Sequence, residues 1–502
     1  KETMYFQDDW RVNDKLNLLM GVRVDNTTTN NTPNANADYF AATGYRTDVG
    51  IDDQVVQPRF GWDYDATDMF MDYFLGGRTY DWLPIESVQM RGGYGLFVGR
   101  LPSVWVSNSW SNDGGINKAE FEAFTFSGQP IDGVMFDPNS NDQSRATRLS
   151  ASAGGDVNSL DSDFGLPSSW RFALAFDIDL ANGWFYGVEF NHDDVDRAFA
   201  YIDPALEGNV AGTLPDGRTY YNNSEGDLHT TWTDKGQTRS WSHKLSKSFL
   251  DDKLKMYVSY SNTDARDVFA AGSSTQGSNY GKYATCNNQF YPDLCTKPSL
   301  WGRDERWVGT LDYTADIFGA ENPTRFYLFW KRESGRRFSY TYDDNIIGDG
   351  YRDERDLWYV PTGPGDPLVS FSDDTGDAFY AYVDKYLSSY KGQVAPANGF
   401  QAPWITRMDL KITQELALPE GRWVGDTKAE LFLDIYNFGN LLDEDNGQIY
   451  DAGYLGVTKS MDVDIVDGAY VYSNFDDGHL RYRNGARFVS SWKMMLGFKL
   501  SF

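Results

Sequence analysis

The last stretch of the chain, residues 492–502, alternates between apolar side chains and side chains that are small or polar, apart from Met495. The apolar set occupies every even position: Trp492, Met494, Leu496, Phe498, Leu500 and Phe502. A two-residue period predicts a β-strand with one apolar face, and about 9–11 residues are enough for a tilted strand to cross a bilayer. The pattern favours the closing strand of a membrane β-barrel.

The same alternation recurs along the chain, most clearly in residues 168–193. One face of the expected first strand carries only apolar side chains: Trp170, Phe172, Leu174, Phe176, Ile178 and Leu180. A helix would instead bring together residues 170, 173 and 177, which are Trp, Ala and Asp. We therefore expect an all-β chain of about thirteen antiparallel strands, near residues 4–11, 15–25, 55–65, 86–98, 170–180, 184–200, 238–250, 253–263, 304–315, 324–340, 404–416, 427–438 and 492–502.

The connections between these strands alternate in length. Those after residues 11, 180, 250, 315 and 416 are short, the 66–85 link is intermediate, and those after residues 25, 98, 200, 263, 340 and 438 are long. Outer-membrane barrels have short periplasmic turns and long extracellular loops, and their strand numbers are even in bacterial single-chain barrels. An odd count predicts that residues 1–502 form the C-terminal part of a larger barrel.

Composition agrees with a barrel but does not decide it. Aromatic residues make up 16% of the 502 residues, which suits aromatic girdles, although a large soluble sandwich or propeller could carry similar numbers. No run of about 18 apolar residues predicts a transmembrane helix. The formal net charge of −28 opposes binding to nucleic acid.

Several segments resemble TonB-dependent outer-membrane receptors, most closely the Oar-like branch. The resemblance lies in YFQDDWRVNDKLNLLMGVRVD at 5–25, VQPRFGWDYD at 56–65, MRGGYGLFVGR at 90–100, GDGYRDERDLWYVP at 348–361 and AELFLDIYNFGNLLDEDN at 429–446. It implies a 22-stranded barrel, of which these would be roughly strands 10 to 22, and an N-terminal plug and TonB box that we do not find in residues 1–502.

The resemblance also implies a function and partners. The function is active transport of a scarce or large substrate, with peptide or protein cargo as one option, across the outer membrane of a Gram-negative cell. The implied partners are outer-membrane lipid, TonB acting through the plug, an extracellular substrate, and the barrel-assembly machinery. The carboxy-terminus resembles the signal that this machinery recognises, through Trp492, Phe498, Leu500 and Phe502.

Other functions remain open at this stage. A passive porin or surface adhesin would have the same strands, and a secreted carbohydrate-binding β protein would share the alternation. An enzyme ranks last because the four His are scattered and no GxSxG, P-loop or HExxH motif occurs. Polar side chains at alternate strand positions should line the interior: Arg171, Asp177, Asp179, Glu189, Arg325, Lys331, Arg407, Asp409, Lys411, Glu430 and Asp434.

Three features of the expected loops suggest further sites. Closely spaced oxygen donors around two glycines would suit calcium, with a plain turn as the alternative: Asp343, Asn345, Asp349, Asp353 and Asp356. Cys286 and Cys295 lie close together without a neighbouring His, which suggests a disulfide rather than a zinc site, with two unrelated free thiols as the alternative. Aromatic residues of the loops, among them Trp358, Tyr359, Phe379 and Tyr386, could form an outer binding surface or pack against one another.

Overall fold

The structure is a computed structural model of the 502-residue chain. It describes residues 1–74, 76, 85–100, 103–114, 156–223, 226–269, 272–281, 294–350, 355–416, 428–453, 456–478, 480–482 and 489–501.

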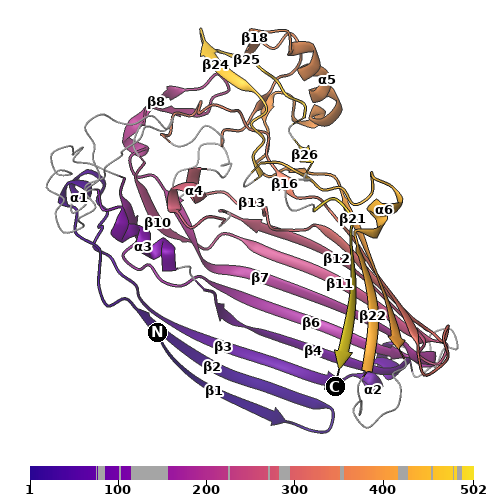
Figure 1. The fold of residues 1–502 in the computed structure, drawn as a ribbon. Coiled ribbons are helices and arrows are strands. Elements are labelled where there is room, and N and C mark those ends of the chain that lie inside the picture. Colours follow the sequence, from indigo (N-terminus) through magenta and orange to yellow (C-terminus); the bar gives the residue numbers. More distant parts are fainter. Residues whose placement is uncertain are drawn as a thin grey trace, which may run out of the picture.

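Thirteen strands follow one another in a single curved antiparallel sheet (Figure 1). They are β1 (Glu2–Arg11), β2 (Leu16–Thr28), β3 (Asp52–Asp65), β4 (Ile85–Val98), β6 (Ser168–Leu180), β7 (Trp184–Ile202), β11 (Gln237–Phe249), β12 (Leu254–Asp267), β14 (Glu305–Ala315), β15 (Thr324–Glu333), β21 (Ile405–Leu416), β22 (Lys428–Tyr436) and β27 (Lys493–Ser501). The predicted all-β fold and strand number are confirmed. Over the described residues, β1 and β27 form the two edges of the sheet and do not pair with each other.

The register gives the sheet two chemically different faces. On β15, Phe326, Leu328 and Trp330 lie opposite apolar residues of β21, whereas Tyr327 and Lys331 lie opposite its basic residues. Directly opposed residues share a face, so the apolar positions of all thirteen strands gather on one side. The polar residues predicted to line the interior gather on the other, as the strand pairings confirm.

The apolar face is exposed rather than packed against another layer. Large apolar side chains remain open to the surroundings on every part of the sheet: Met4, Phe6, Val22, Val56, Phe60, Tyr94, Trp241, Leu245, Trp307, Leu311, Leu431, Met494, Leu496, Phe498 and Leu500. Leu496 is 70% exposed and Phe498 56%. Such a continuous apolar surface is far larger than a soluble monomer normally leaves uncovered.

Aromatic rings form two bands on this apolar face. Near the loop end, ring centroids lie 4.5 Å apart in both Phe190–Trp241 and Tyr260–Trp307. Near the turn end, Trp184 lies 5.9 Å from Phe249. Six residues separate Trp184 from Phe190 on β7, which is about 20 Å along a strand at about 3.3 Å per residue. Between the bands lie aliphatic residues such as Val188 and Leu245, together with the stacked pair Tyr186 and His243.

Several aromatic rings cover a glycine on the neighbouring strand. Trp62 lies directly opposite Gly92, and a Cβ added at Gly92 would be 2.1 Å from Trp62 Cζ2. Phe432 covers Gly497 of β27 in the same way, with a distance of 2.2 Å to Cζ. These glycines make room for a ring that lies flat across the sheet, and a larger side chain would force the ring away.

The alternation of loop length is confirmed. Close turns join β1 to β2, β6 to β7, β11 to β12 and β14 to β15, and the link from β3 to β4 contains α2 (Thr67–Met69) and η1 (Phe70–Phe74). In the turn after β11, Leu250, Asp251 and Asp252 all have positive φ. The long connections lie together at the opposite end of the sheet (Figure 1).

The long connections contain their own short elements. These are α1 (Ala37–Thr43), α3 (Ser103–Ser111), β5 (Asn158–Leu160), β8 (Val210–Thr213), β9 (Thr219–Tyr221), β10 (Leu228–Thr233), α4 (Gln276–Gly281), β13 (Lys297–Pro298), β16 (Arg337–Phe338), β17 (Tyr359–Val360), β18 (Val369–Phe371), α5 (Gly376–Tyr386), β19 (Gln393–Val394), β20 (Phe400–Gln401), α6 (Phe438–Leu442), β23 (Tyr450–Asp451), β24 (Asp462–Val466), β25 (Ala469–Ser473) and β26 (Arg481–Tyr482). Within the described part of the chain, no helix is long and apolar enough to cross a membrane.

The main hydrophobic core lies in these loops and not in the sheet. Trp358, Phe379 and Tyr472 are completely buried in a cluster that joins the connection after β15 to the connection after β22. β18 pairs in parallel with β25 across the same two connections. The loops therefore form a packed assembly over one end of the sheet, which fits the loop-packing alternative for the buried aromatic residues.

One predicted strand was too long. The sequence predicts a strand over residues 324–340, but β15 ends at Glu333. The chain then crosses another connection so closely that a Cβ at Gly335 would lie 2.0 Å from the Ala402 carbonyl oxygen. Only glycine allows this crossing without a shift of the backbone, and the crossing diverts the chain into the loop assembly.

Candidate binding site on the polar face

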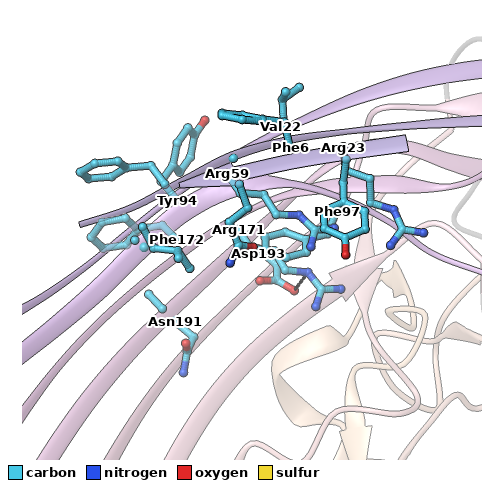
Figure 2. A pocket seen from close by; sticks show the side chains of 18 of the residues that line it. Phe6, Val22, Arg23, Arg59, Tyr94, Phe97, Arg171, Phe172, Asn191 and Asp193 are labelled. Atoms are coloured by element: carbon cyan, nitrogen blue, oxygen red, sulfur yellow. Dashed lines mark ion pairs between the residues drawn. The ribbon is translucent and has the colours of Figure 1, made fainter. Parts of the chain in front are cut away.

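A hollow of about 820 Å³ lies on the polar face of strands β1 to β11 (Figure 2). Its floor is a row of small residues, in which Gly61 lies opposite Gly93 and Gly93 lies opposite Ala173. Asn191 and Ser240 continue the row on β7 and β11. On β3, β4 and β6 this row holds only glycine or alanine. Few side-chain atoms therefore project from the sheet here, which leaves space for a ligand.

Basic side chains frame this hollow on the side nearer the loops. Arg59 and Arg171 both lie opposite Gly95 of β4, and their guanidinium carbons lie 4.4 and 5.4 Å from the centroid of the Phe97 ring. A Cβ at Gly95 would be 3.1 Å from Arg59 Cγ. The missing side chain at Gly95 thus lets two arginines of different strands approach the same aromatic ring.

The carboxylates near these arginines are only partly available to them. Asp193 pairs with Arg171 at 3.4 Å. Asp25 pairs with Arg23 at 3.0 Å and also with Lys1 at 3.3 Å. Asp25 further accepts hydrogen bonds from Thr3 and Gln57, at 2.7 and 3.0 Å. Its oxygens are therefore already used by four groups.

Arg59 differs from its neighbours because it forms no ion pair within the described segments. Its Nη2 donates to the amide oxygen of Gln57 at 3.1 Å. A guanidinium has five N–H donors, so most of this group stays available to a ligand or to water.

Farther toward the turn end, the charged side chains of the polar face pair with one another. Arg91 lies 2.8 Å from Asp177 and 3.7 Å from Glu189, and Lys244 lies 3.3 Å from Glu189. Two cations and two carboxylates balance in this cluster. Such a network holds neighbouring strands in register and leaves little charge for a ligand.

The predicted calcium donors point to different partners. Asp349 pairs with Arg355 at 3.5 Å, and Asp343 pairs with Lys459 at 3.3 Å. Asn345 accepts from the Gly348 amide, and Asp356 accepts from the Ile347 amide. Among the described residues no three His, Cys, Asp or Glu side chains could hold a metal ion. Asp353 lies outside the described residues, and calcium stays a prediction.

Only one of the two cysteines of the predicted disulfide lies in the described residues. Cys295 lies in a described segment and is not a free thiol. Cys286 lies outside the described residues, so the pairing of the two cysteines stays a prediction.

The closing strand lies where the sequence places it. β27 pairs with β22 along its length, and Trp492, Phe498 and Leu500 are 45, 56 and 50% exposed. Phe502 falls outside the described residues. Recognition of these side chains by an assembly machinery stays a prediction.

One grouping in the loops contains the residue types of a hydrolytic triad. Ser159 Oγ lies 2.8 Å from His229 Nδ1, and Asp161 Oδ2 lies 3.7 Å from His229 Nε2. Ser159 is 0% exposed and His229 1%, and the Tyr45 ring stacks on the imidazole at 3.9 Å. A nucleophile without access to substrate cannot act, so this grouping serves to pack the loops.

Sequence reasoning found Arg171 but missed Arg23, Arg59 and Phe97. Alternation would have placed all four on the polar face, since each lies an even number of residues from a polar-face neighbour on its strand. Two signals in the sequence, the Gly-rich run GGYG at 92–95 and the apolar Phe97 at a polar-face position, could have pointed to a special arrangement there.

The similarity of this chain to known proteins lies in structure, at low identity. A scan against protein-family models and a search of curated proteins both find no match. Solved structures that the chain is similar to include the outer membrane transporter YddB from Escherichia coli, with 12% identity and a TM-score of 0.43 over 91% of this chain and 42% of that one. BauA, the ferric preacinetobactin receptor from Acinetobacter baumannii, matches with 10% identity and a TM-score of 0.39 over 97% of this chain and 41% of that one. The RagAB peptide importer matches with 10% identity and a TM-score of 0.39 over 87% and 43%. The chain spans about two fifths of the length of these structures.

Proposed function

We propose that the chain forms part of the wall of an outer-membrane β-barrel that takes up a substrate from outside a Gram-negative cell. The observation that carries this proposal is the inverted arrangement of the sheet. Its apolar face is exposed, and its charged residues face the opposite side. Lipid is the surrounding that makes such an exposed face stable, because a transmembrane barrel turns apolar residues outward and polar residues inward.

The two aromatic bands support the same orientation. Trp and Tyr prefer the membrane–water interfaces, and here aromatic pairs lie at both ends of the apolar face. The loop assembly lies beyond one band and the close turns beyond the other, which matches the extracellular and periplasmic sides.

Energised transport through TonB is the finer part of the proposal. It rests on the segments at 5–25, 56–65, 90–100, 348–361 and 429–446, which resemble TonB-dependent receptors. A packed loop assembly above a polar interior suits a gated receptor better than an open pore, since buried aromatic residues such as Trp358 hold the loops together.

Fractionation and uptake would test both parts. Cells with and without the native gene are compared for the location of the protein and for uptake of a fluorophore-labelled casein digest, with and without a protonophore. Outer-membrane location with uptake that the protonophore abolishes supports the proposal. Uptake that the protonophore leaves unchanged indicates a passive porin, and a protein that stays soluble without detergent refutes the membrane assignment.

A further inference from the structure

We propose that the hollow framed by Arg23, Arg59 and Arg171 binds an oxyanion, a carboxylate or phosphate group carried by the transported substrate. The inference rests on the proposed function for its substrate, but the site itself is argued from the polar face alone. Figure 2 shows these three arginines beside Phe97, with Asp193 and Asn191 on the neighbouring strand.

The local charge favours an anion. Within the described residues, four cationic groups, Lys1 and the three arginines, share two carboxylates, Asp25 and Asp193. This excess of positive charge is notable in a chain whose formal net charge is −28. A ligand oxyanion would supply the missing counter-charge through charge-assisted hydrogen bonds.

Arg59 is the residue best placed to make the decisive contact. It is exposed, and its only charged or polar partner in the described ranges is the Gln57 amide. Its guanidinium lies 4.4 Å from the Phe97 ring centroid. Contact with an aromatic face fixes the plane of the guanidinium and leaves its edge to form paired hydrogen bonds with an oxyanion.

The hollow beside Arg59 has room for the rest of such a ligand. Its volume is about 820 Å³, and its floor of Gly61, Gly93 and Ala173 presents backbone. Asn191 and Ser240, which continue this row, offer uncharged hydrogen-bonding groups. A substrate with an anionic group and a polar body of moderate size fits these surroundings, whereas the balanced cluster around Arg91 offers no comparable charge.

Calorimetry on the full chain in detergent at low salt would test the site. The probes are citrate for a carboxylate source and inorganic pyrophosphate for a phosphate source, with glucose as the uncharged control. Arg59→Gln should weaken probe binding at least about tenfold, since it removes a charge-assisted contact. Arg325→Gln is the matched control, because Arg325 lies on the same face but is paired with Asp312, and it should leave probe binding within about twofold.

Gly95→Ala provides a second variant that keeps every charge. The added Cβ would lie 2.8 Å from the Pro58 carbonyl oxygen and 3.1 Å from Arg59 Cα and Cγ. The β3 backbone at Arg59 must therefore shift, which should move Arg59 from the Phe97 ring and weaken binding again. Retention of the folded state is checked by circular dichroism, and if Arg59→Gln does not fold, Gly95→Ala decides.

Each outcome is decisive. Binding of either probe, or of both, supports the site, and binding of one alone identifies the carboxylate or the phosphate as its ligand. Absence of binding by both probes, or binding by Arg59→Gln equal to that of the wild type, overturns it. Because calorimetry does not require uptake, binding without energised uptake would refute the transport function and leave the site standing, and uptake without probe binding would do the reverse.

Discussion

A buried carboxyl group should make the loop assembly less stable as the pH rises. Asp203 follows β7 and is 4% exposed. Its oxygens accept hydrogen bonds from the Ala205 amide and the Asn223 side chain, both at 2.8 Å. Burial, together with repulsion from Asp227 and Asp349, raises the pKa of Asp203 from its ordinary 3.8 to about 8.

The direction in which the stability of the loop assembly changes with pH follows from proton linkage. A carboxyl whose pKa is raised in the folded state holds a proton that the open loop releases, so its stabilising contribution is complete below pH 4 and is lost as the pH rises toward 8. Each pH unit in this range is worth at most about 1.4 kcal/mol for one group. Between pH 5 and pH 7 the free energy of opening should therefore fall by about 3 kcal/mol.

Hydrogen exchange of the segment 203–223, corrected for the intrinsic effect of pH on exchange, measures this change in the full chain in detergent. Asp203→Asn should remove most of the pH dependence. Asp366→Asn is the matched control: burial also acts to raise the pKa of Asp366, but hydrogen bonds from Thr362 and Leu368 outweigh it and lower that pKa. Equal protection of the wild type at pH 5 and pH 7 would refute the reasoning.

Other substitutions test the packing and the two faces. Asp53→Ala should destabilise the protein by about 1–3 kcal/mol, because it removes the acceptor of the half-buried Arg197 guanidinium, 2.9 Å away, and of the buried Leu166 amide; urea unfolding followed by fluorescence measures this. Gly92→Val should displace the Trp62 ring and cost about 1–3 kcal/mol, seen as a lower temperature for the loss of the compact band on unheated gels. Leu328→Arg, in the middle of the apolar face, should cost about 2–4 kcal/mol in lipid, measured by unfolding from vesicles.

Each of these has a result that would contradict it. Asp53→Ala with an unchanged unfolding midpoint would show that the pair contributes nothing. An unshifted Trp emission in Gly92→Val would mean that the ring had not moved. Tyr327→Arg, one residue away on the polar face, is the control for Leu328→Arg, and equal effects of the two would argue against a lipid-facing side.

The sheet could be predicted from sequence because every strand has lipid on one face and a polar interior on the other. Apolar and polar residues therefore alternate along each strand. Residues such as Phe326, Leu328 and Trp330 carry that signal locally, and close turns mark the strand ends. The loops could not be predicted in this way. In their core, the hydroxyl groups of Tyr342 and Tyr472 form a hydrogen bond of 2.8 Å. No short-range sequence pattern predicts a contact between residues so far apart in the chain.

The candidate binding site could be predicted from sequence only in part. Alternation assigns Arg59 and Arg171 to the polar face, but it does not show that Gly95 lets both reach Phe97. The premature end of β15 has a similar origin, since the close approach of Gly335 to Ala402 depends on a distant connection.

The central claim is that one face of this sheet meets lipid and the other meets water. A nitroxide scan over β15, Thr324–Glu333, in the full chain reconstituted into vesicles tests it most directly, with oxygen as the apolar relaxant and a nickel chelate as the aqueous one. We expect oxygen maxima at Phe326, Leu328 and Trp330 and nickel maxima at Tyr327, Phe329 and Lys331. Nickel access at positions 326, 328 and 330 equal to that at their neighbours would contradict it.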